Sequence, residues 1–414
     1  MPASARTLIL GLTPDGRLLF LTRFIRLFAY GSLSVILVFY LTGLGLSTAH
    51  VGMLLTLTLL GDTVVSLSLT TQADRIGRGK TLLAGALLMV GAGLIFASTR
   101  SFLLLCAAGI IGVISPSGNE VGPFLSIEQA ALSEVIAAPK RTEVFAWYTL
   151  TGAIATALGA LFGGGLAQTL QKSIPPVASE RTIVILYALL GILLAILFHR
   201  LSREAEVHAD EFTPQLRTML GIRSARATVL KLSALFSLDS FAGGFVIQSF
   251  AAYWFYLRFQ VEPATLGGIF FGANVLAGVS ALLASRIAKR IGLVRTMVFT
   301  HLPSNVLLLM VPWMPNLQLA ILVLLLRFSI SQMDVPTRQS YTMAIVRPEE
   351  RSAAAGITGV ARTTGAAIAP LFAGMLFARP ALISLPFLIA GVLKIGYDLL
   401  LYRAFVRVPP PEES

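Results

Sequence analysis

Four polar side chains lie in an apolar segment at spacings of seven, four and three residues: Arg327, Asp334, Arg338 and Tyr341. On a helix these spacings place all four on one face. Ionisable groups inside a membrane-length apolar segment are costly unless they line water or find partners, so this stripe is a candidate site for a solute or a proton. Pro336 is predicted to interrupt the helix just after Asp334 and to leave backbone carbonyls open to a ligand.

A second interrupted segment is predicted in the first half of the chain. The apolar block 102–115 is followed by a run of helix breakers between Ser115 and Pro123. Glu120 lies within that run, and Glu128 lies in the apolar piece that follows it. Broken helices at corresponding positions in two halves are the best sequence pointer to a transport site. Further polar candidates inside other apolar blocks are Arg26, Asp62, Asp239, Asn274 and Arg362.

The elements that carry these side chains are predicted to be membrane helices. Hydrophobic residues make up 56% of the 414 positions and charged residues 13%, well below the charged share of a soluble domain. Twelve apolar blocks approach or exceed the length needed to cross a bilayer, which is roughly 20 residues per helix. The sequence therefore predicts an all-α integral membrane protein with twelve transmembrane helices.

The distribution of charge predicts the topology. Most Lys and Arg residues fall in the termini and in alternate loops, which by the positive-inside rule places both termini in the cytoplasm. The net charge of +12 is thus explained by membrane topology and not by a nucleic-acid surface. The predicted organisation is a cytoplasmic N-terminal segment (1–17), an N-terminal six-helix bundle (18–198), a cytoplasmic linker (199–228), a C-terminal six-helix bundle (229–402) and a cytoplasmic tail (403–414).

The two halves are internal repeats. Residues 73–81 align with residues 288–296, and Gln129 aligns with Gln339, at a spacing of about 210–215 residues. Because each half begins on the same side of the membrane, the repeats are parallel. This arrangement excludes the inverted-repeat transporter architectures.

The repeat alignment pairs charges of opposite sign. Glu128 aligns with Arg338, and Arg26 aligns with Asp239. Three interpretations are open: these residues face one another across a central cavity, they form internal ion pairs that stabilise one conformation, or Glu128 and Arg338 merely lie near the cytoplasmic ends of their helices. Either of the first two arrangements would neutralise charges that are costly inside a membrane.

Other ionisable residues in the apolar blocks are expected to be structural. Lys394 and Asp398 lie four residues apart in the twelfth block and are expected to neutralise each other. The four histidines lie near block ends or in loops without a metal-ligand spacing, so no metal site is predicted. The sequence contains no recognisable cofactor-binding loop or catalytic nucleophile, so neither a cofactor nor enzymatic activity is expected.

The loop between the second and third blocks, residues 74–80 (Asp-Arg-Ile-Gly-Arg-Gly-Lys), resembles the signature loop of the major facilitator superfamily. Thr70 replaces the first glycine of that pattern, and Gly79 replaces one of its basic residues. The resemblance implies two six-helix bundles that open alternately to the two sides of the membrane. It also implies a gating role for the loop and its second copy: Asp74, Arg75, Gly77, Arg78, Lys80, Lys289, Arg290, Gly292 and Arg295.

Small residues recur at four-residue spacing in the fifth and eleventh blocks, and the positions of interest are Gly159, Gly163, Gly164, Gly365, Pro370 and Gly374. Such spacing lets helix backbones approach closely, and packing alone explains either copy. The pattern also resembles the antiporter motif of the superfamily, although neither copy is complete. This second resemblance favours export over uptake.

The predicted function is secondary active transport of a small solute, coupled to protons and directed outward. Proton-coupled uptake of a charged or zwitterionic solute is the alternative, and a membrane sensor that does not transport is a third hypothesis. The basic residue that many proton-driven exporters carry in the fourth helix is missing from residues 106–109, so a carboxylate elsewhere must carry the proton. The expected partners are the solute, protons and the lipid bilayer, without nucleic acid. The protein is expected to act as a monomer, and its short loops suggest a bacterial inner membrane.

Overall fold

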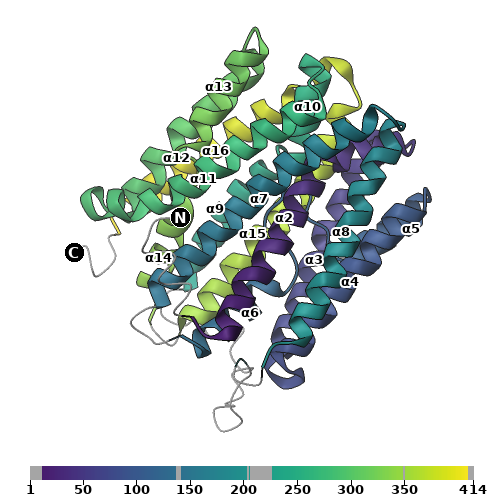
Figure 1. Cartoon of the computed structure of the whole chain (residues 1–414). Coiled ribbons are helices and arrows are strands. Elements are labelled where there is room, and N and C mark those ends of the chain that lie inside the picture. Colours follow the sequence, from purple (N-terminus) through teal and green to yellow (C-terminus); the bar gives the residue numbers. More distant parts are fainter. Residues whose placement is uncertain (1–11, 137–140, 203–204, 206–225, 348–349, 409–414) are drawn as a thin grey trace. The chain divides into compact units, whose positions relative to one another are not determined.

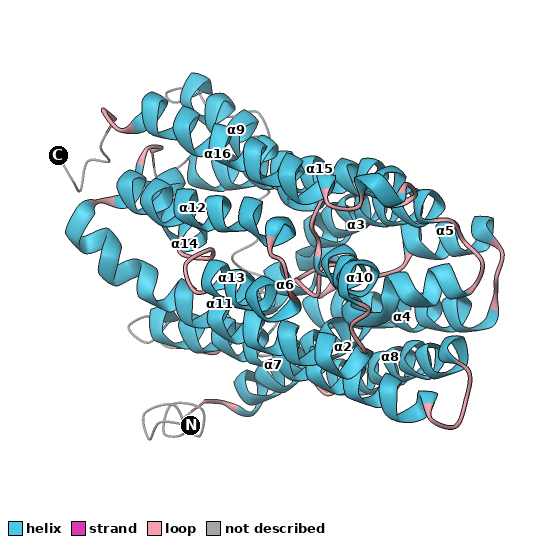
Figure 2. Ribbon diagram, turned by 90° about the horizontal axis from the view of Figure 1, so that it is seen from above, coloured by secondary structure: helices cyan, strands magenta, loops and turns pink. Residues whose placement is uncertain are grey.

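The computed structural model describes residues 12–136, 141–202, 205, 226–347 and 350–408. Within these ranges all regular structure is helical, as Figure 1 and Figure 2 show. The chain forms two compact units: unit 1 comprises Met1–Phe212 and Gln260–Phe271, and unit 2 comprises Thr213–Phe259 and Gly272–Ser414. Most of the predicted linker 199–228 and of the predicted segment 1–17 lies outside the described residues, as does the end of the predicted tail 403–414.

Unit 1 contains the helices of the first half of the chain: α2 (Pro14–Gly43), α3 (Thr48–Ile76), α4 (Arg78–Ser98), α5 (Phe102–Ile111), α6 (Phe124–Glu134), α7 (Arg141–Gln171) and α8 (Pro176–His199). Thr13 and Ser47 begin α2 and α3, because their hydroxyl oxygens accept hydrogen bonds from backbone N–H groups of the first turn, at 3.2 and 3.3 Å. α2 packs against α7 and α8, α4 packs against α8, and α3 packs against α5.

Unit 2 contains the second half: α9 (Arg226–Gly244), α10 (Gln248–Phe259), α11 (Pro263–Ile291, whose first residues belong to unit 1), α12 (Leu293–Met310), η5 (Val311–Trp313), α13 (Leu317–Phe328), α14 (Asp334–Ala344), α15 (Arg351–Phe377), η7 (Pro380–Leu382) and α16 (Leu385–Phe405). α9 packs against α15 and α16, and α12 packs against α16. In each unit the first span therefore contacts the fifth and sixth, and the third contacts the sixth. This shared packing confirms the predicted internal repeat.

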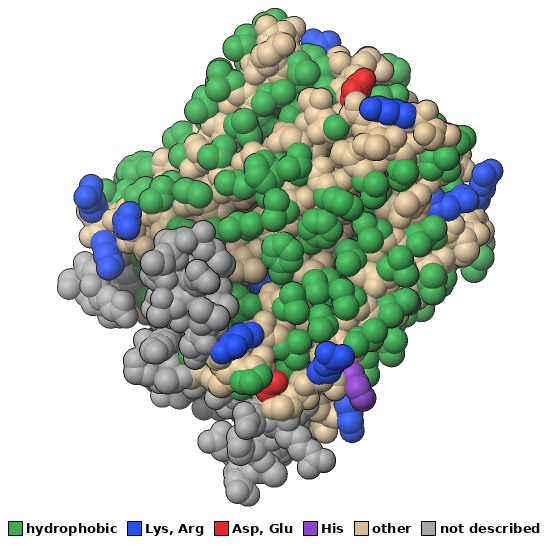
Figure 3. All heavy atoms as spheres, in the orientation of Figure 1, with side chains coloured by type: hydrophobic (Ala, Val, Ile, Leu, Met, Phe, Trp, Pro, Cys, Tyr) green, Lys and Arg blue, Asp and Glu red, His purple; other side chains and the backbone are tan. Residues whose placement is uncertain are grey.

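The described helices account for twelve membrane spans. Ten segments are long and apolar enough to cross a membrane, and the shorter apolar helices α5 and α13 begin the fourth and tenth spans. Large hydrophobic side chains are exposed on these helices, among them Leu103 (77% exposed) and Val64 (65%). Figure 3 shows hydrophobic side chains spread over the face in view, with most Lys and Arg side chains toward its margins. An apolar surface of this extent faces lipid and not water, which confirms the predicted membrane fold.

The fourth span is interrupted where the sequence predicts. Residues 112–123 separate α5 from α6 and include Gly118 and Gly122, whose φ angles are 70° and 77°. Positive φ angles are readily available only to glycine, which has no Cβ. These two positive-φ glycines and two prolines, Pro116 and Pro123, thus prevent a continuous helix.

Two further spans are interrupted. Residues 329–333 separate α13 from α14, so the break ends before Asp334. The break predicted at Pro336 is therefore wrong in position: this proline lies in the first turn of α14, where its missing N–H would have no helical partner. The seventh span is divided at 245–247 between α9 and α10, an interruption that the sequence does not predict.

A single glycine joins two helices at the same place in each unit. Gly77 (φ 105°) connects α3 to α4, and Gly292 (φ 86°) connects α11 to α12. In each case the hydroxyl of a threonine four residues later, Thr81 or Thr296, donates a hydrogen bond to the glycine carbonyl oxygen, at 2.9 and 2.7 Å. The two copies of the loop therefore share one backbone geometry.

The small residues of the fifth span bring two backbones together. A Cβ atom added at Gly159 of α7 would lie 2.1 Å from the carbonyl oxygen of Phe28 in α2, and one added at Gly163 would lie 2.5 Å from that of Ser32. In unit 2 a Cβ added at Gly365 of α15 would lie 2.4 Å from the carbonyl oxygen of Ser237 in α9. The small residues at these positions are therefore required by close helix packing.

Replacing Gly159 with alanine is expected to lower the free energy of unfolding by roughly 1–3 kcal/mol, because the new methyl group meets main-chain atoms that cannot rotate away. Gly165 on the same helix is the matched control, since a Cβ added there meets no atom within 4 Å. The thermal unfolding midpoints of purified Gly159→Ala and Gly165→Ala protein measure the difference. Equal midpoints would show that α2 and α7 can separate without cost.

Candidate functional site

Unit 1 contains a group of four charges, three of them buried and Glu120 partly exposed, which we call the N-terminal charge cluster: Arg23, Arg26, Glu120 and Glu128. Arg26 of α2 forms ion pairs with both glutamates, and Arg23 pairs with Glu120 at 2.7 Å. The side chains of Arg26 and Glu128 are completely inaccessible to solvent. The interruption of the fourth span makes this possible, because it places Glu120 in the loop and Glu128 on α6, both within reach of α2.

The carboxylate of Glu128 has three hydrogen-bond donors around it. Besides Arg26, its carboxylate accepts hydrogen bonds from the hydroxyl groups of Thr22, at 3.2 Å, and Tyr148, at 2.6 Å. The Arg26 guanidinium also lies over the ring of Phe124, 4.6 Å from its centroid. A buried ion pair offsets its desolvation cost only when its remaining hydrogen-bonding groups are also satisfied, and this carboxylate meets that condition.

Asp62 of α3 differs from the carboxylates of the cluster. One of its oxygen atoms accepts hydrogen bonds from the backbone N–H of Gly122, at 2.6 Å, and from the hydroxyl of Ser66, at 3.2 Å. Among the described residues it has no cationic partner. Asp62 therefore ties α3 to the broken part of the fourth span without neutralising its charge.

Unit 2 contains a second buried group, the C-terminal charge cluster: Asp239, His301, Asp334, Arg338, Lys394 and Asp398. Asp239 of α9 is its centre. The carboxylate of Asp239 pairs with Lys394 at 2.5 Å and with Arg338 at 3.2 Å. Arg338 also pairs with Asp334, 3.3 Å away and one turn earlier on α14. The ion pairs of Asp239 thus connect three helices: α9, α14 and α16.

His301 of α12 links the remaining acid to the cluster. One ring nitrogen lies 2.8 Å from Asp398, and the other lies 3.7 Å from Asp239. Asn305 donates a further hydrogen bond to Asp398 at 2.8 Å. The prediction that Lys394 and Asp398 neutralise each other is wrong, because they face different partners. The expectation that the histidines are peripheral is also wrong for His301, which is 4% exposed.

The charges of opposite sign that the repeat alignment pairs are each neutralised by a partner inside their own unit. Arg26 pairs with Glu128 between the first and fourth spans, and Asp239 pairs with Arg338 between the seventh and tenth. The two pairs occupy equivalent places with their signs reversed. Of the three open interpretations, the structure shows internal ion pairs, each of them within one unit.

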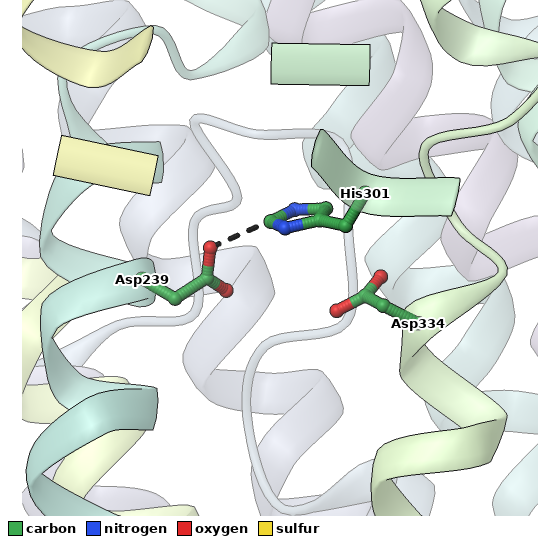
Figure 4. Close-up of side chains that lie close together, drawn as sticks. All are labelled: Asp239, His301 and Asp334. Carbon is green, nitrogen blue, oxygen red and sulfur yellow. Dashed lines mark ion pairs between the residues drawn. The ribbon is translucent and has the colours of Figure 1, made fainter. Parts of the chain in front are cut away.

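Asp239, His301 and Asp334 also have the spacing of metal ligands. Each offers one ligand atom, and these atoms lie within 4.8 Å of one another. Figure 4 shows the three side chains extending toward one another. However, Lys394 and Arg338 already bind the two carboxylates. A divalent cation would have to enter a site that two protein cations occupy, so the cluster does not fit a metal.

Four other predicted pathway residues lie apart from these ion pairs. Tyr341 is completely buried in a hydrophobic core and donates a hydrogen bond to the carbonyl oxygen of Val408, so its contacts are structural. Asn274 donates to the side chain of Gln248 at 3.0 Å. Arg327 and Arg362 are partly accessible and have neither a hydrogen bond nor an ion pair in the part of the chain that the structure describes.

The predicted gating residues lie around the single-glycine connections. Arg75 and Lys80 are exposed, whereas Arg78 is 6% exposed and donates a hydrogen bond to the carbonyl oxygen of Ala205 at 3.3 Å. The side chain of Asp74 lies outside the described residues. In the second copy three basic side chains are exposed: Lys289, Arg290 and Arg295.

Sequence reasoning missed several residues that complete the clusters. Arg23 precedes Arg26 by three positions in the same apolar block, and this helical spacing could have included it. Lys394 and His301 are visible in the sequence as ionisable residues, but their partners are not, and Tyr148 and Asn305 carry no local signal. Their roles depend on how neighbouring helices are rotated, which periodicity does not specify.

Comparison with known proteins identifies the family. The family model described as Major Facilitator Superfamily matches residues 19–333 and 259–414. The membrane protein YJR124C of Saccharomyces cerevisiae is 30% identical, over 95% of this chain and 94% of that protein. Among solved structures, a bacterial homolog of the human lysosomal transporter Spinster, in an inward-facing and occupied conformation, is 16% identical with a TM-score of 0.73, covering 96% of this chain and 99% of that chain. The nucleoside transporter NupG is 13% identical with a TM-score of 0.72, covering 95% and 98%.

A third solved structure, of a D-xylose-proton symporter, is 14% identical with a TM-score of 0.70, covering 94% of this chain and 97% of that chain. At these identities the solved structures establish a shared fold. The match to the family model extends over nearly the whole chain and includes both units. The chain is therefore a multi-pass membrane transporter of the major facilitator superfamily.

Proposed function

We propose that this protein exports a small charged solute by alternating access of its two halves, and that proton entry drives the export. The observation that carries the coupling is Asp62. It is a carboxylate within an apolar helix, without a cationic partner among the described residues, and it is bonded to the interrupted span. An ionised carboxylate is costly in such surroundings, and binding a proton removes that cost.

The contacts of Asp62 give the proton a route to the rest of unit 1. Protonation weakens the carboxylate as an acceptor for the N–H of Gly122. Gly122 lies two residues from Glu120, which holds Arg23 and Arg26 of α2. A proton on α3 thereby changes the forces on the loop that anchors α2.

The outward direction rests on a different feature. The small-residue patterns of α7 and α15 resemble the antiporter motif, and their glycines pack directly against α2 and α9. Uptake with protons is the second candidate, favoured by the fold that the chain shares with a D-xylose-proton symporter. A sensor would have the same fold but would carry no solute. Comparing solute accumulation in inside-out and right-side-out vesicles distinguishes the two directions. An exporter accumulates solute in inside-out vesicles, and an importer accumulates it in right-side-out vesicles.

The remaining assignments belong to the same proposal. The protein works as a monomer. Both of its termini lie in the cytoplasm, because most Lys and Arg residues fall in the termini and in the loops on the same side as the termini. Its partners are the solute, protons and lipid, and it is not an enzyme. The bacterial inner membrane stays a prediction from the sequence, and the relative at 30% identity is a yeast protein.

Asp62→Asn protein in liposomes is expected to lose proton-driven solute movement, because asparagine keeps the hydrogen bond to Gly122 but cannot release a proton. Exchange of solute across the membrane without a pH gradient should continue at about the wild-type rate. The measurement compares flux after an imposed pH jump with exchange at equal pH. Glu262→Gln, which changes an exposed acid, is the control. Unaltered pH-driven flux in Asp62→Asn would remove Asp62 from the coupling mechanism.

A further inference from the structure

The C-terminal charge cluster lies beside two arginines that it does not neutralise. Arg362 of α15 and Arg327 of α13 both interact electrostatically with Asp239 and Asp334. Neither forms an ion pair within the described residues, and the Nε atom of each is buried without a hydrogen-bond partner. Each side chain as a whole is nevertheless partly accessible.

The nearby carboxylates are already occupied. Asp239 binds Lys394 and Arg338, and Arg338 also binds Asp334. Asp398 is held by His301 and Asn305. These contacts leave the two arginines without an anion of their own.

The charge count of unit 2 shows an excess of positive charge at this place. The four cations are Arg327, Arg338, Arg362 and Lys394, and the three carboxylates are Asp239, Asp334 and Asp398. His301 adds to the positive side whenever it is protonated. The repulsion between Arg362 and Arg338 increases the cost of the uncompensated charge. The N-terminal charge cluster has no such excess, since its two arginines face two glutamates.

We propose that Arg327 and Arg362 bind the negatively charged group of the transported solute, which is a small organic anion with a carboxylate or phosphate group. Guanidinium groups suit both chemistries, because their planar donors match the oxygen atoms of either. Arg327 is oriented by its contact with Phe328, whose ring centroid lies 4.8 Å from the guanidinium carbon. The proposal rests on the proposed transport function for the movement of the anion, but binding can be tested separately.

Thermal unfolding of the purified protein tests binding without transport. Four probes are compared at equal ionic strength: succinate, glycerol 3-phosphate, glucose and choline. Succinate or glycerol 3-phosphate is expected to raise the unfolding midpoint of the wild type, whereas glucose and choline leave it unchanged. Arg362→Gln and Arg327→Gln should fold with nearly wild-type midpoints in the absence of probe, because neither change removes a described hydrogen bond or ion pair, and should lose the response to anions. If neither anion raises the wild-type midpoint, or if both variants respond as the wild type does, the anion site is wrong.

Uptake of the same four probes into liposomes tests the transported class. Arg362→Gln is expected to lower anion uptake about tenfold or more, whereas Arg362→Lys, which keeps the charge, should retain part of it. Arg379→Gln, at an exposed position of the same unit, is the matched control and should transport normally. Uptake of glucose or choline in preference to the anions would overturn the proposal. Anion binding without any uptake would instead contradict the proposed transport function and leave the site intact.

Discussion

Replacing Arg26 with glutamine is expected to lower the free energy of unfolding by roughly 3–5 kcal/mol, the largest loss of any single change in unit 1. Arg26 neutralises both Glu120 and Glu128, and Glu128 has no access to solvent. After the change Arg23 remains for Glu120, but Glu128 keeps only two hydroxyl donors. Denaturant-induced unfolding of the purified variant measures the loss.

The double variant Arg26→Gln, Glu128→Gln provides the decisive comparison. Removing both charges eliminates the buried uncompensated carboxylate, so most of the stability should return. Arg100→Gln is the control, since Arg100 is exposed and its charge costs nothing to solvate. If the double variant is less stable than the single one, the pair stabilises the fold in itself and charge compensation is not the reason for its presence.

Asp239→Asn is expected to produce the largest combined effect on stability and transport. The carboxylate of Asp239 binds Lys394 and Arg338, and only Arg338 has a second acid, Asp334, to turn to. The buried Lys394 ammonium would lose its anion, at a cost of roughly 3–5 kcal/mol. Asp239 also joins α9 to α14 and α16 beside the proposed anion site, so we expect solute uptake to fall together with stability. Unfolding and uptake are measured on the same preparation.

Two variants distinguish lost charge balance from general disruption. Asp239→Asn combined with Lys394→Gln should recover most of the stability, because neither charge then remains alone. Asp398→Asn changes an acid of the same cluster whose two oxygen atoms contact His301 and Asn305, and it should cost roughly 1–3 kcal/mol because asparagine keeps only one of the two acceptors. A cost for Asp398→Asn as large as that for Asp239→Asn would place the centre of the cluster elsewhere.

The fold could be predicted from the sequence because a membrane permits few alternatives. Apolar length identifies the spans, and the helix breakers at 115–123 identify the interruption of the fourth. The interruption at 245–247 could not be predicted in the same way, because Phe245, Val246 and Ile247 are apolar residues that also fit a continuous helix. Composition specifies how long a span is more reliably than where its backbone turns.

The candidate site was predictable only in part. Charges inside apolar blocks identified Arg26, Glu128, Asp239 and Arg338, and each of them has an ionic partner in the structure. The spacing of the tenth span also placed Tyr341 on the same face, yet its ring packs into a core of apolar side chains from α9, α12 and α16, and its hydroxyl donates a hydrogen bond to the carbonyl oxygen of Val408. The pairing of Lys394 with Asp239 depends on which face of α16 meets α9, and a one-helix pattern contains no information about a contact between two helices.

The reversal of sign between the two internal pairs has a consequence for how such a protein can change over time. If each half balances its own buried charge, a substitution that removes a cation from one half is compensated only by a second substitution in that same half. Lineages of this transporter should therefore differ by coupled replacements confined to one repeat. The ancestral duplication could then diverge into halves of opposite polarity without passing through an unfolded protein.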